Sequence, residues 1–498
     1  MNVNPITRLD YPDPDVIRVE DTYYMVSTTM HFMPGCEILQ SFDLVHWEHA
    51  TYVYETLDHT DAQQLKSGQN IYGQGMWAAS LRYHEGRFCI CFVANDTRKT
   101  YLYTSEKIDG PWKKQLIEGF YHDGSLLFDE DGRNYIVYGN DEIWITELNE
   151  DLTAPKKDGL HRLLVSDHKN PELGYEGSHI QKINGYYYIF LVHSLRDRWM
   201  RTEACFYSDS LEGEFTGGDV LCDDRGYCGQ GVAQGGIVDT PDGKWYAMLF
   251  QDSGAVGRIP ILLPVTWKDH FPFFGQNGHV PEEIEVHSTR PGYIYQPLVG
   301  SDDFCNGLLP RWQFNHDPDP RYYHLDALQG TYTITTREVC TELTQAVNTL
   351  TQRMSYPSCA AEVTVDASAL KEGDVAGLCA LQSCYAAVGI TKHHGKYEVL
   401  MLDKKEDGIL DMTERTVVES HQMDFRLEAD FCNMKDEARC YYRVNKGDWL
   451  PIGTVHKLYF KLDHFTGCRF GLFCYAAEET GGSACFRDFK YYDVDEIS

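Results

Sequence analysis

A strand, an acidic or glycine-containing turn and an aromatic strand follow one another five times in the first half of this 498-residue sequence. The aromatic residues of the second strands lie roughly 45–65 residues apart, about the length of one four-stranded blade of a β-propeller. The five hairpins are expected at residues 16–24, 81–88, 127–135, 180–187 and 237–246. We therefore predict a five-bladed β-propeller over residues 1–290.

A second pattern supports this prediction. Three of the hairpins are followed by a serine, a short turn and an aromatic residue, at residues 41–47, 105–112 and 208–215. Each such segment is expected to be a turn that closes the outer part of a blade. The alternative is an ordinary all-β protein, in which hairpins with Asp-Gly or Asn-Gly turns are also common. Two motifs that recur in the same order favour the propeller.

The pattern changes after the proline-containing stretch at residues 291–297. Alternating strands continue, for example at residues 359–365 and 457–462, but without the hairpin signature. Short strands at regular spacing are typical of a β-sandwich, which we predict over residues 300–498. The linker is short and has no flexible Gly/Ser run, so we expect the sandwich to be part of the working protein.

The charge of the chain limits its partners. It contains 44 Lys and Arg against 75 Asp and Glu, a net charge of −31. A field of this sign repels nucleic acids and anionic membranes. The amino end carries neither a basic nor an apolar signal segment, and no window is apolar enough to span a bilayer, which predicts a cytoplasmic protein. An oligomer is left open.

Three carboxylates stand a few residues before the strands of the first, third and fourth hairpins: Asp13, Asp123 and Glu176. The innermost strands of a propeller begin around its axis, so these side chains are expected to converge there. Two carboxylates across a glycosidic bond are the minimum for acid/base glycoside hydrolysis, and a third can tune the acid. A single Asp before a strand is better explained as a turn cap, but three equivalent positions weaken that explanation.

Trp77 precedes the second hairpin and would complete this ring of side chains. An aromatic face of this kind can stack on a sugar, and it can equally be core packing; both interpretations stay open.

The order of the motifs resembles glycoside hydrolase family 43, which comprises five-bladed β-xylosidases, arabinofuranosidases and arabinanases. The motifs that carry the resemblance are P-D-P-D-V-I-R-V at residues 12–19, H-D-G-S-L-L-F-D-E-D-G-R at residues 122–133, and Y-E-G-S-H-x-x-K-I-N-G-Y-Y-Y at residues 175–188. The resemblance implies that Asp13 is the general base, that Asp123 tunes and orients the acid, and that Glu176 is the general acid. It also implies hydrolysis with inversion of the anomeric configuration.

Residues 301–304, 312–316 and 350–353 look like the concanavalin-like sandwich of family 43 β-xylosidases. In those relatives a sandwich loop partly closes the pocket and favours exo-attack on short oligosaccharides. The resemblance further implies that Phe32 is an aromatic pocket wall and that Arg258 binds substrate.

Two positions depart from the family pattern. The family motif W-A-P-H is W-A-A-S here, at residues 77–80, and Gln234 stands where a histidine commonly helps to hold an axial ion or water. The chemistry itself is expected to need no cofactor. A structural or activating calcium ion is left open, because the amide oxygen of Gln234 suits a hard cation.

The leading hypothesis is an inverting exo-glycosidase that releases xylose from β-1,4-xylo-oligosaccharides and α-L-arabinofuranose from arabinose-substituted oligosaccharides. D-Xylopyranose and L-arabinofuranose can present similar hydroxyls to one pocket, so the sequence does not separate the two activities. Two alternatives stay open: an arabinan-directed α-L-arabinofuranosidase, and a non-catalytic propeller in which the acidic ring only binds sugar hydroxyls.

Overall fold

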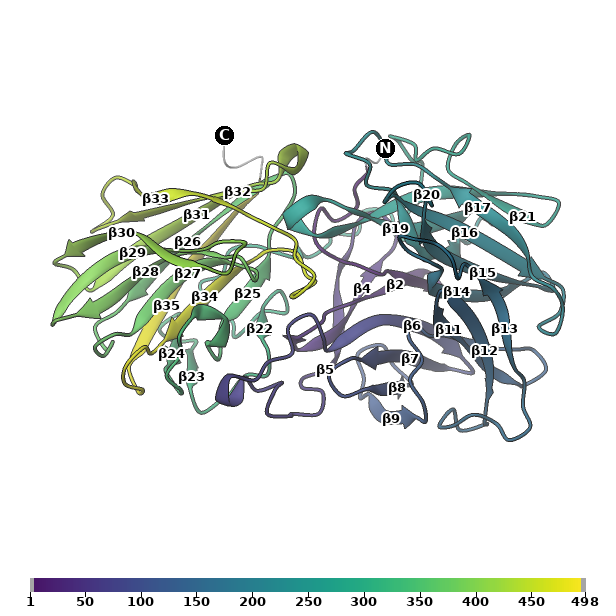
Figure 1. The fold of residues 1–498 in the computed structure, drawn as a ribbon, viewed down its shortest axis with the longest axis horizontal. Coiled ribbons are helices and arrows are strands. Elements are labelled where there is room, and N and C mark those ends of the chain that lie inside the picture. Colours follow the sequence, from purple (N-terminus) through teal and green to yellow (C-terminus); the bar gives the residue numbers. More distant parts are fainter. Residues whose placement is uncertain (1–3, 494–498) are drawn as a thin grey trace.

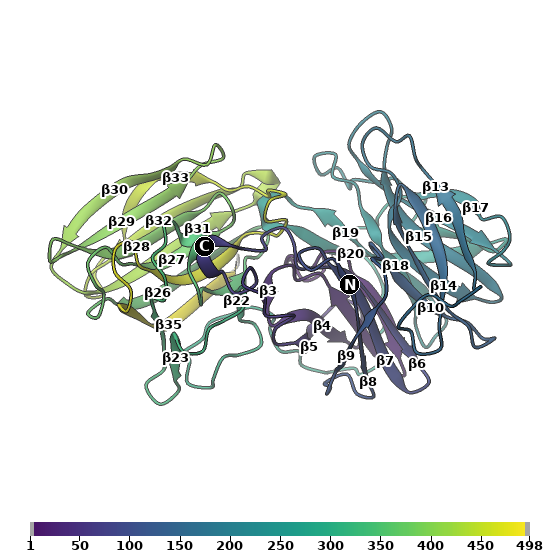
Figure 2. The ribbon, with the colours of Figure 1, turned by 60° about the horizontal axis from the view of Figure 1, so that its bottom comes forward.

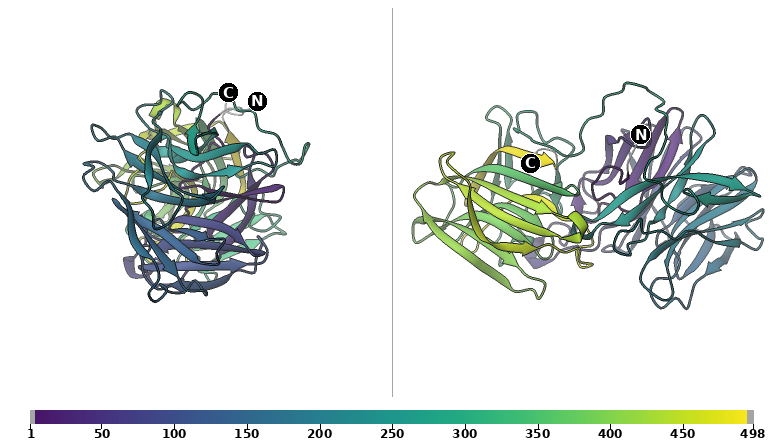
Figure 3. Two further views of the ribbon diagram at one scale, coloured as in Figure 1. Left: turned by 90° about the vertical axis from the view of Figure 1, so that its right-hand side faces the viewer. Right: turned by 90° about the horizontal axis from the view of Figure 1, so that it is seen from above.

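The computed structural model describes residues 4–493 and contains two β-sheet bodies that lie side by side (Figures 1 and 3). In the first body, five antiparallel sheets of four strands each follow one another along the chain. Their first strands contact one another in sequence, and the last contacts the first again. These inner strands are β1 (Asp15–Val19), β6 (Met76–His84), β10 (Ser125–Phe128), β14 (Glu176–Ile183) and β18 (Ala233–Asp239). The predicted five-bladed propeller is confirmed.

The remaining strands of each blade follow from the axis outward. The second strands complete the five predicted hairpins: β2 (Thr22–Ser27), β7 (Arg87–Ala94), β11 (Asn134–Asn140), β15 (Tyr186–Ser194) and β19 (Trp245–Asp252). The third strands are β4 (Gly35–Ser41), β8 (Lys99–Ser105), β12 (Glu142–Leu148), β16 (Arg201–Ser208) and β20 (Arg258–Lys268). The outer strands are β5 (Glu48–Tyr54), β9 (Lys113–Ile117), β13 (His161–Ser166), β17 (Thr216–Leu221) and β21 (Phe271–Phe274). The three predicted outer turns join the third strand to the fourth strand in blades 1, 2 and 4.

Aromatic rings fill the wedges between blades. Tyr54 at the outer edge of blade 1 lies 5.9 Å from Phe92 of blade 2, measured between ring centroids, and Phe92 lies 5.4 Å from Tyr101 of the same blade. All three side chains are buried. Large flat rings on pleated sheets bury much apolar area per residue, which agrees with the aromatic content of 13%.

The amino-terminal segment closes the ring. The Asn4 side chain donates a hydrogen bond to the backbone oxygen of Leu262 (2.8 Å) and accepts one from the Leu262 amide (3.0 Å). The Tyr11 amide donates to the backbone oxygen of Arg258 (3.0 Å). The segment that leads into blade 1 is thus fixed to the third strand of blade 5.

The second body is a sandwich of two antiparallel sheets. The first sheet has the order β3 (Phe32–Met33), β22 (Gln313–Asn315), β25 (Leu350–Arg353), β34 (Arg469–Tyr475), β27 (Val375–Leu381), β28 (Ala386–His393), β29 (Lys396–Lys404) and β30 (Leu410–Val418). The second has the order β23 (Tyr323–Asp326), β24 (Thr331–Thr335), β35 (Ser483–Asp493), β26 (Ser358–Asp366), β31 (Gln422–Asp430), β32 (Glu437–Arg443) and β33 (Leu450–Lys457). Helices among residues 4–493 are limited to short turns, none of which could span a membrane.

The two bodies share backbone and side-chain contacts. Strand β3 belongs to the propeller segment of the chain but pairs with β22 as an edge strand of the sandwich sheet (Figure 2). Arg353 at the end of β25 reaches into the propeller, where its guanidinium pairs with Glu37 (2.8 Å) and lies 4.0 Å from the centre of the Tyr11 ring. Burial would raise the pKa of Glu37, but the Arg353 cation outweighs it and lowers that pKa to about 2. The sandwich is therefore anchored to the propeller by a buried ion pair.

Replacement of Arg353 by Met should destabilise the protein by about 3–5 kcal/mol, because the buried Glu37 carboxylate would lose its arginine and keep only His49 (3.1 Å) as an ion-pair partner within residues 4–493. Guanidinium chloride unfolding of R353M measures the loss. The matched control is R321M, which removes an arginine of the same sandwich whose side chain is 73% exposed and paired with Asp319. An equal fall in the two variants would show that the buried pair has no special weight.

Candidate active site

The structure brings the three predicted carboxylates to one end of the propeller axis. Asp13 and Asp123 each lie two residues before an inner strand, β1 and β10, and Glu176 is the first residue of β14. The charges of Glu176 and Asp13 both act on the pKa of Asp123, so the three groups lie within electrostatic reach of one another. Convergence at the starts of the inner strands follows directly from the propeller geometry.

Local backbone distortions aim these side chains. Asp13 and Asp123 adopt left-handed backbone angles, with φ of 53° and 48°. Such conformations are costly for non-glycine residues and concentrate at functional sites. At Glu176 the ladder with β15 is irregular: Glu176 pairs with Val192, and the next paired residue of β14 is His179. A bulge of this kind redirects a side chain out of the regular alternation.

Asp13 is held by two hydrogen bonds. Thr28 Oγ1 donates to Asp13 Oδ2 (2.6 Å), and Arg258 Nη1 donates to Asp13 Oδ1 (3.0 Å). Arg258 is 2% exposed, and its Nε and Nη2 have no hydrogen-bond partner among the described residues. A buried charged donor without an acceptor costs free energy, and sugar hydroxyls would be suitable acceptors for Nε and Nη2. The predicted substrate arginine therefore lies beside the predicted base.

Asp123 and His122 form a charged pair next to Glu176. Burial raises the pKa of Asp123 to about 6, the charges of Glu176 and Asp13 add to the rise, and the His122 cation opposes it. The Asp123 carboxylate in turn is the main cause that raises the pKa of His122 to about 9. His122 Nε2 lies 3.6 Å from Asp123 Oδ2 and 3.8 Å from Glu176 Oε2. One imidazolium thus faces two carboxylates.

Glu176 is more accessible than its neighbours. Its side chain is 20% exposed, against 6% for Asp123. Asn140 Nδ2 donates a hydrogen bond to Glu176 Oε2 (2.8 Å), and the Gly177 amide donates to Asp123 Oδ2 (3.1 Å). The chain therefore orients Glu176 through one oxygen and leaves the carboxyl open to the pocket, as proton donation to a substrate requires.

An aromatic wall faces the carboxylates. The Trp77 ring lies 5.8 Å from the His122 ring and 5.4 Å from the Phe465 ring. Phe465 belongs to the sandwich, and the Arg258 guanidinium lies 4.5 Å from the centre of its ring. A loop of the second body thus contacts Trp77 and Arg258 beside the carboxylates.

Phe32 is placed elsewhere than expected. It belongs to β3, is 2% exposed, and packs in a cluster with sandwich side chains such as Leu343 and Cys379. The guanidinium of Arg469 lies 3.4 Å from the centre of its ring. Because β3 pairs with the sandwich sheet, Phe32 stabilises the junction of the two bodies and does not line the carboxylate pocket.

Gln234 packs beside the backbone that follows Glu176. The Gln234 backbone N–H donates a hydrogen bond to Glu203 Oε2 (2.7 Å), and the Gln234 side chain packs so closely on Gly177 that a Cβ there would stand 2.7 Å from Gln234 Cγ. Burial raises the pKa of Glu203 well above its usual range. Gln234 therefore supports the backbone that carries Glu176.

Arg82 binds oxygen atoms of three other blades at the propeller axis. Arg82 donates hydrogen bonds to Asp15 Oδ2 (2.7 Å), to the backbone oxygen of Leu126 (2.9 Å) and to that of Ile180 (3.2 Å). The guanidinium therefore engages one carboxylate and two backbone oxygens near the axis. Calcium binding at Gln234 is left open.

Two other clusters have a metal-like donor set. One ligand atom each from His122, Asp123 and Glu176 lie within 4.8 Å of one another, and Glu372, His393 and His394 form a second group on the sandwich.

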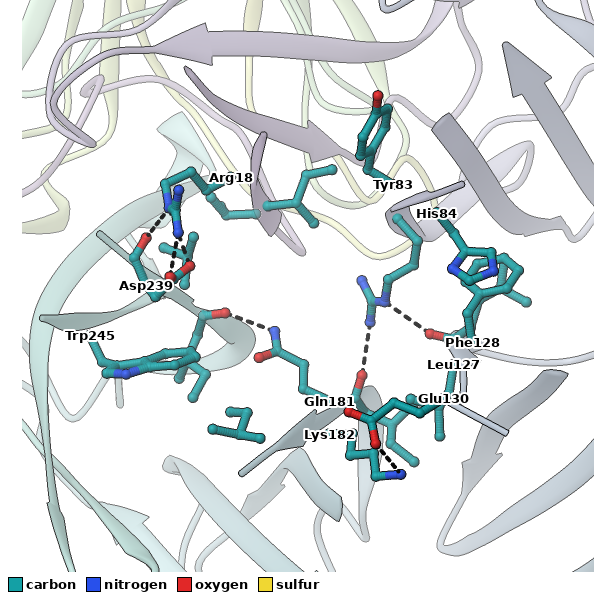
Figure 4. A pocket seen from close by; sticks show the side chains of 18 residues that line it. Arg18, Tyr83, His84, Leu127, Phe128, Glu130, Gln181, Lys182, Asp239 and Trp245 are labelled. Carbon is teal, nitrogen blue, oxygen red and sulfur yellow. Dashed lines mark hydrogen bonds and ion pairs between the residues drawn. The ribbon is translucent and has the colours of Figure 1, made fainter. Parts of the chain in front are cut away.

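A cavity of about 490 Å³ opens at the opposite end of the axis (Figure 4). Its charged side chains pair with one another, as Arg18 does with Asp239 and Lys182 with Glu130. Arg82 lies between this cavity and the three carboxylates, so the cavity is separate from the candidate site.

Sequence reasoning missed three groups of the pocket: His122, Arg201 and Phe465. His122 directly precedes Asp123 in a quoted motif and could have been noticed there. Arg201 pairs with Asp252. Burial and the Arg258 cation lower the pKa of Arg201, and the charges of Glu176 and Asp13 oppose this fall. Neither Arg201 nor Phe465 lies in a motif, so no local signal marked them.

Comparison with known proteins agrees with this geometry. Residues 3–272 match the model of "Glycosyl hydrolases family 43", and residues 301–492 match "Beta xylosidase C-terminal Concanavalin A-like domain". A solved "Bifunctional GH43-CE" from Bacteroides eggerthii is 42% identical with a TM-score of 0.92 over 99% of this chain. This chain spans 63% of that protein, less than two thirds of its length.

Curated relatives are more distant. A "Beta-xylosidase" from Formosa agariphila is 27% identical over 99% of this chain and 89% of its own length. A "Xylosidase/arabinosidase 43B" from Humicola insolens is 25% identical over 98% of this chain and 96% of its own length. The two family matches, the overall similarity and the three converging carboxylates show that the chain belongs to glycoside hydrolase family 43.

Proposed function

We propose that the protein is an inverting, exo-acting β-xylosidase that also removes α-L-arabinofuranosyl units. Its substrates are xylo-oligosaccharides and arabinose-substituted oligosaccharides. The observation that carries the proposal is the meeting of Asp13, Asp123 and Glu176 at one end of the axis. The names of the Formosa agariphila and Humicola insolens relatives support the pentose specificity.

The geometry suggests a role for each group. Asp13, oriented by Thr28 and Arg258, would accept a proton from the attacking water. Glu176, open to the pocket, would protonate the leaving oxygen. Asp123 would tune and orient the acid, because the His122 imidazolium faces both the Asp123 and the Glu176 carboxyl groups.

The aromatic wall accounts for exo-attack. Trp77 and Phe465 close one side of the pocket, and the orphaned donors of Arg258 would bind hydroxyls of a single terminal sugar. A wall of this kind admits a chain end and excludes the middle of a polymer. The proposed reaction needs no metal ion, because two carboxyl groups carry out its acid and base steps.

The primary test is hydrolysis of β-xylobiose, followed by proton NMR of the first-formed product. An inverting enzyme should release α-xylose first, because water attacks from the face opposite the leaving group. Nitrophenyl β-xyloside and α-L-arabinofuranoside give the ratio of the two activities. Initial β-xylose would overturn inversion and the role of Asp13 as base. Absence of every activity at high enzyme concentration would favour the sugar-binding propeller.

Replacement of Glu176 by Gln should lower kcat on xylobiose by about 10²–10⁴-fold, since general-acid assistance is worth that much. A dinitrophenyl xyloside, whose leaving group needs no proton, should retain most of its rate. E130Q is the matched control, because Glu130 is exposed at the opposite end of the axis. Equal losses on the two substrates would contradict the assignment of Glu176 as the acid.

Replacement of His122 by Asn should move the acidic limb of the pH profile of kcat/KM upward by about one unit. The His122 cation lowers the pKa of Asp123, which lies at about 6, so its removal raises that pKa and Asp123 becomes protonated at higher pH. The control is H46N, which removes an exposed histidine paired with Asp43 on an outer turn. An unmoved limb would show that Asp123 does not control it.

A further inference from the structure

An exposed tryptophan stands on the propeller end that carries the carboxylates. Trp199 lies in the loop at residues 195–200, which joins β15 to β16. Glu176 pairs with Val192 near the end of β15, and Ser194 pairs with Arg201 at the start of β16. The loop therefore rises from the same blade, and at the same end, as the general acid.

The ring of Trp199 is both exposed and fixed. The residue is 45% exposed, and it is the one tryptophan among the exposed large apolar residues at positions 4–493. The guanidinium of Arg201 lies 5.1 Å from the centre of its ring. Such a cation supports one face of the indole and leaves the other to solvent.

The support under the ring is rigid. Arg201 forms an ion pair with Asp252 and lies 5.3 Å from the Phe250 ring, against which Arg258 also packs at 5.3 Å. The platform is therefore continuous with the arginine that binds Asp13.

The loop is also held at its ends. The Leu195 amide donates to the backbone oxygen of Met200 (3.0 Å), and Arg196 pairs with Asp167. A fixed ring loses little conformational entropy when a ligand binds.

The position relative to the acid defines what the ring would contact. A general acid protonates the oxygen of the leaving group, so the leaving sugar must lie on the Glu176 side of the cleaved bond. Trp199 belongs to the blade of Glu176. An aromatic face presented to water suits the C–H face of a neutral pyranose, as rings with one apolar surface and a polar edge prefer such amphipathic partners.

We propose that Trp199, supported by Arg201, forms a subsite for the leaving group that binds a neutral pyranose ring, such as the second residue of xylobiose. The proposal rests on the proposed exo-glycosidase function and adds the determinant of substrate length. It predicts that the subsite contributes to turnover only when the leaving group is a sugar or a similar ring.

Two substrates separate the subsite from the chemistry. The leaving group of β-xylobiose is a xylose unit. The leaving group of β-xylosyl fluoride is a fluoride ion, which cannot contact Trp199. In W199A, kcat/KM on xylobiose should fall about 10-fold or more, a loss typical of one aromatic contact, while that on the fluoride should stay within about twofold. W199F should recover most of the xylobiose activity. Y83A is the matched control, because Tyr83 is equally exposed but lines the cavity at the opposite end.

The outcomes are distinct. An equal loss on both substrates would show that Trp199 only shields Arg201, and no loss on either would exclude the subsite. If wild-type protein cleaves neither substrate, the proposed function fails, and the subsite is then tested by titration calorimetry. In that case xylobiose binding that W199A leaves unchanged overturns the proposal, and binding weakened in W199A but not in Y83A supports it.

Discussion

The arrangement of the site depends on the hydrogen bonds that the Arg82 guanidinium makes at the propeller axis. Arg82 bonds Asp15 in blade 1, the backbone oxygen of Leu126 in blade 3 and that of Ile180 in blade 4, while its own backbone belongs to blade 2. Burial would raise the pKa of Asp15, yet the Arg82 cation and the nearby His179 lower it. One fixed cation thus joins the inner strands of four blades. Asp13, Asp123 and Glu176 lie at or just before the starts of three of these strands, so their spacing is set by the same contacts.

The negative charges of the three carboxylates are compensated by nearby cations. Carboxylates at Asp13, Asp123 and Glu176 would repel one another without compensation. Cations compensate them: Arg258 bonds Asp13, and His122 faces both Asp123 and Glu176. Arg201 lies within electrostatic reach of Asp13 and Glu176. Asp13 and Glu176 therefore have separate cationic partners. Separate partners allow one group to lose a proton while the other supplies one.

The propeller fold and the three carboxylates could be predicted from the sequence because both depend on residues that are neighbours in the chain. A hairpin turn and the strand that follows it are neighbours in the chain, and Asp13, Asp123 and Glu176 each lie at or within two residues of the start of an inner strand. Phe32 was misplaced for the opposite reason. Its strand pairs with residues near 315, and no local pattern reports a partner so distant in sequence. Phe465 and Arg201 were missed because their roles arise only from tertiary packing.

The junction of the two bodies has a consequence for how the protein is made. The carboxylate of Asp10 accepts hydrogen bonds from the amides of Arg258 and Gly467, and Phe465 lies two residues before that second donor. The propeller can close its ring once blade 5 has emerged from the ribosome, but its pocket then lacks a wall. Some two hundred further residues must be synthesised before the Phe465 loop arrives. The blades can therefore pair along the nascent chain before Phe465 exists, and the site would be completed last by the sandwich.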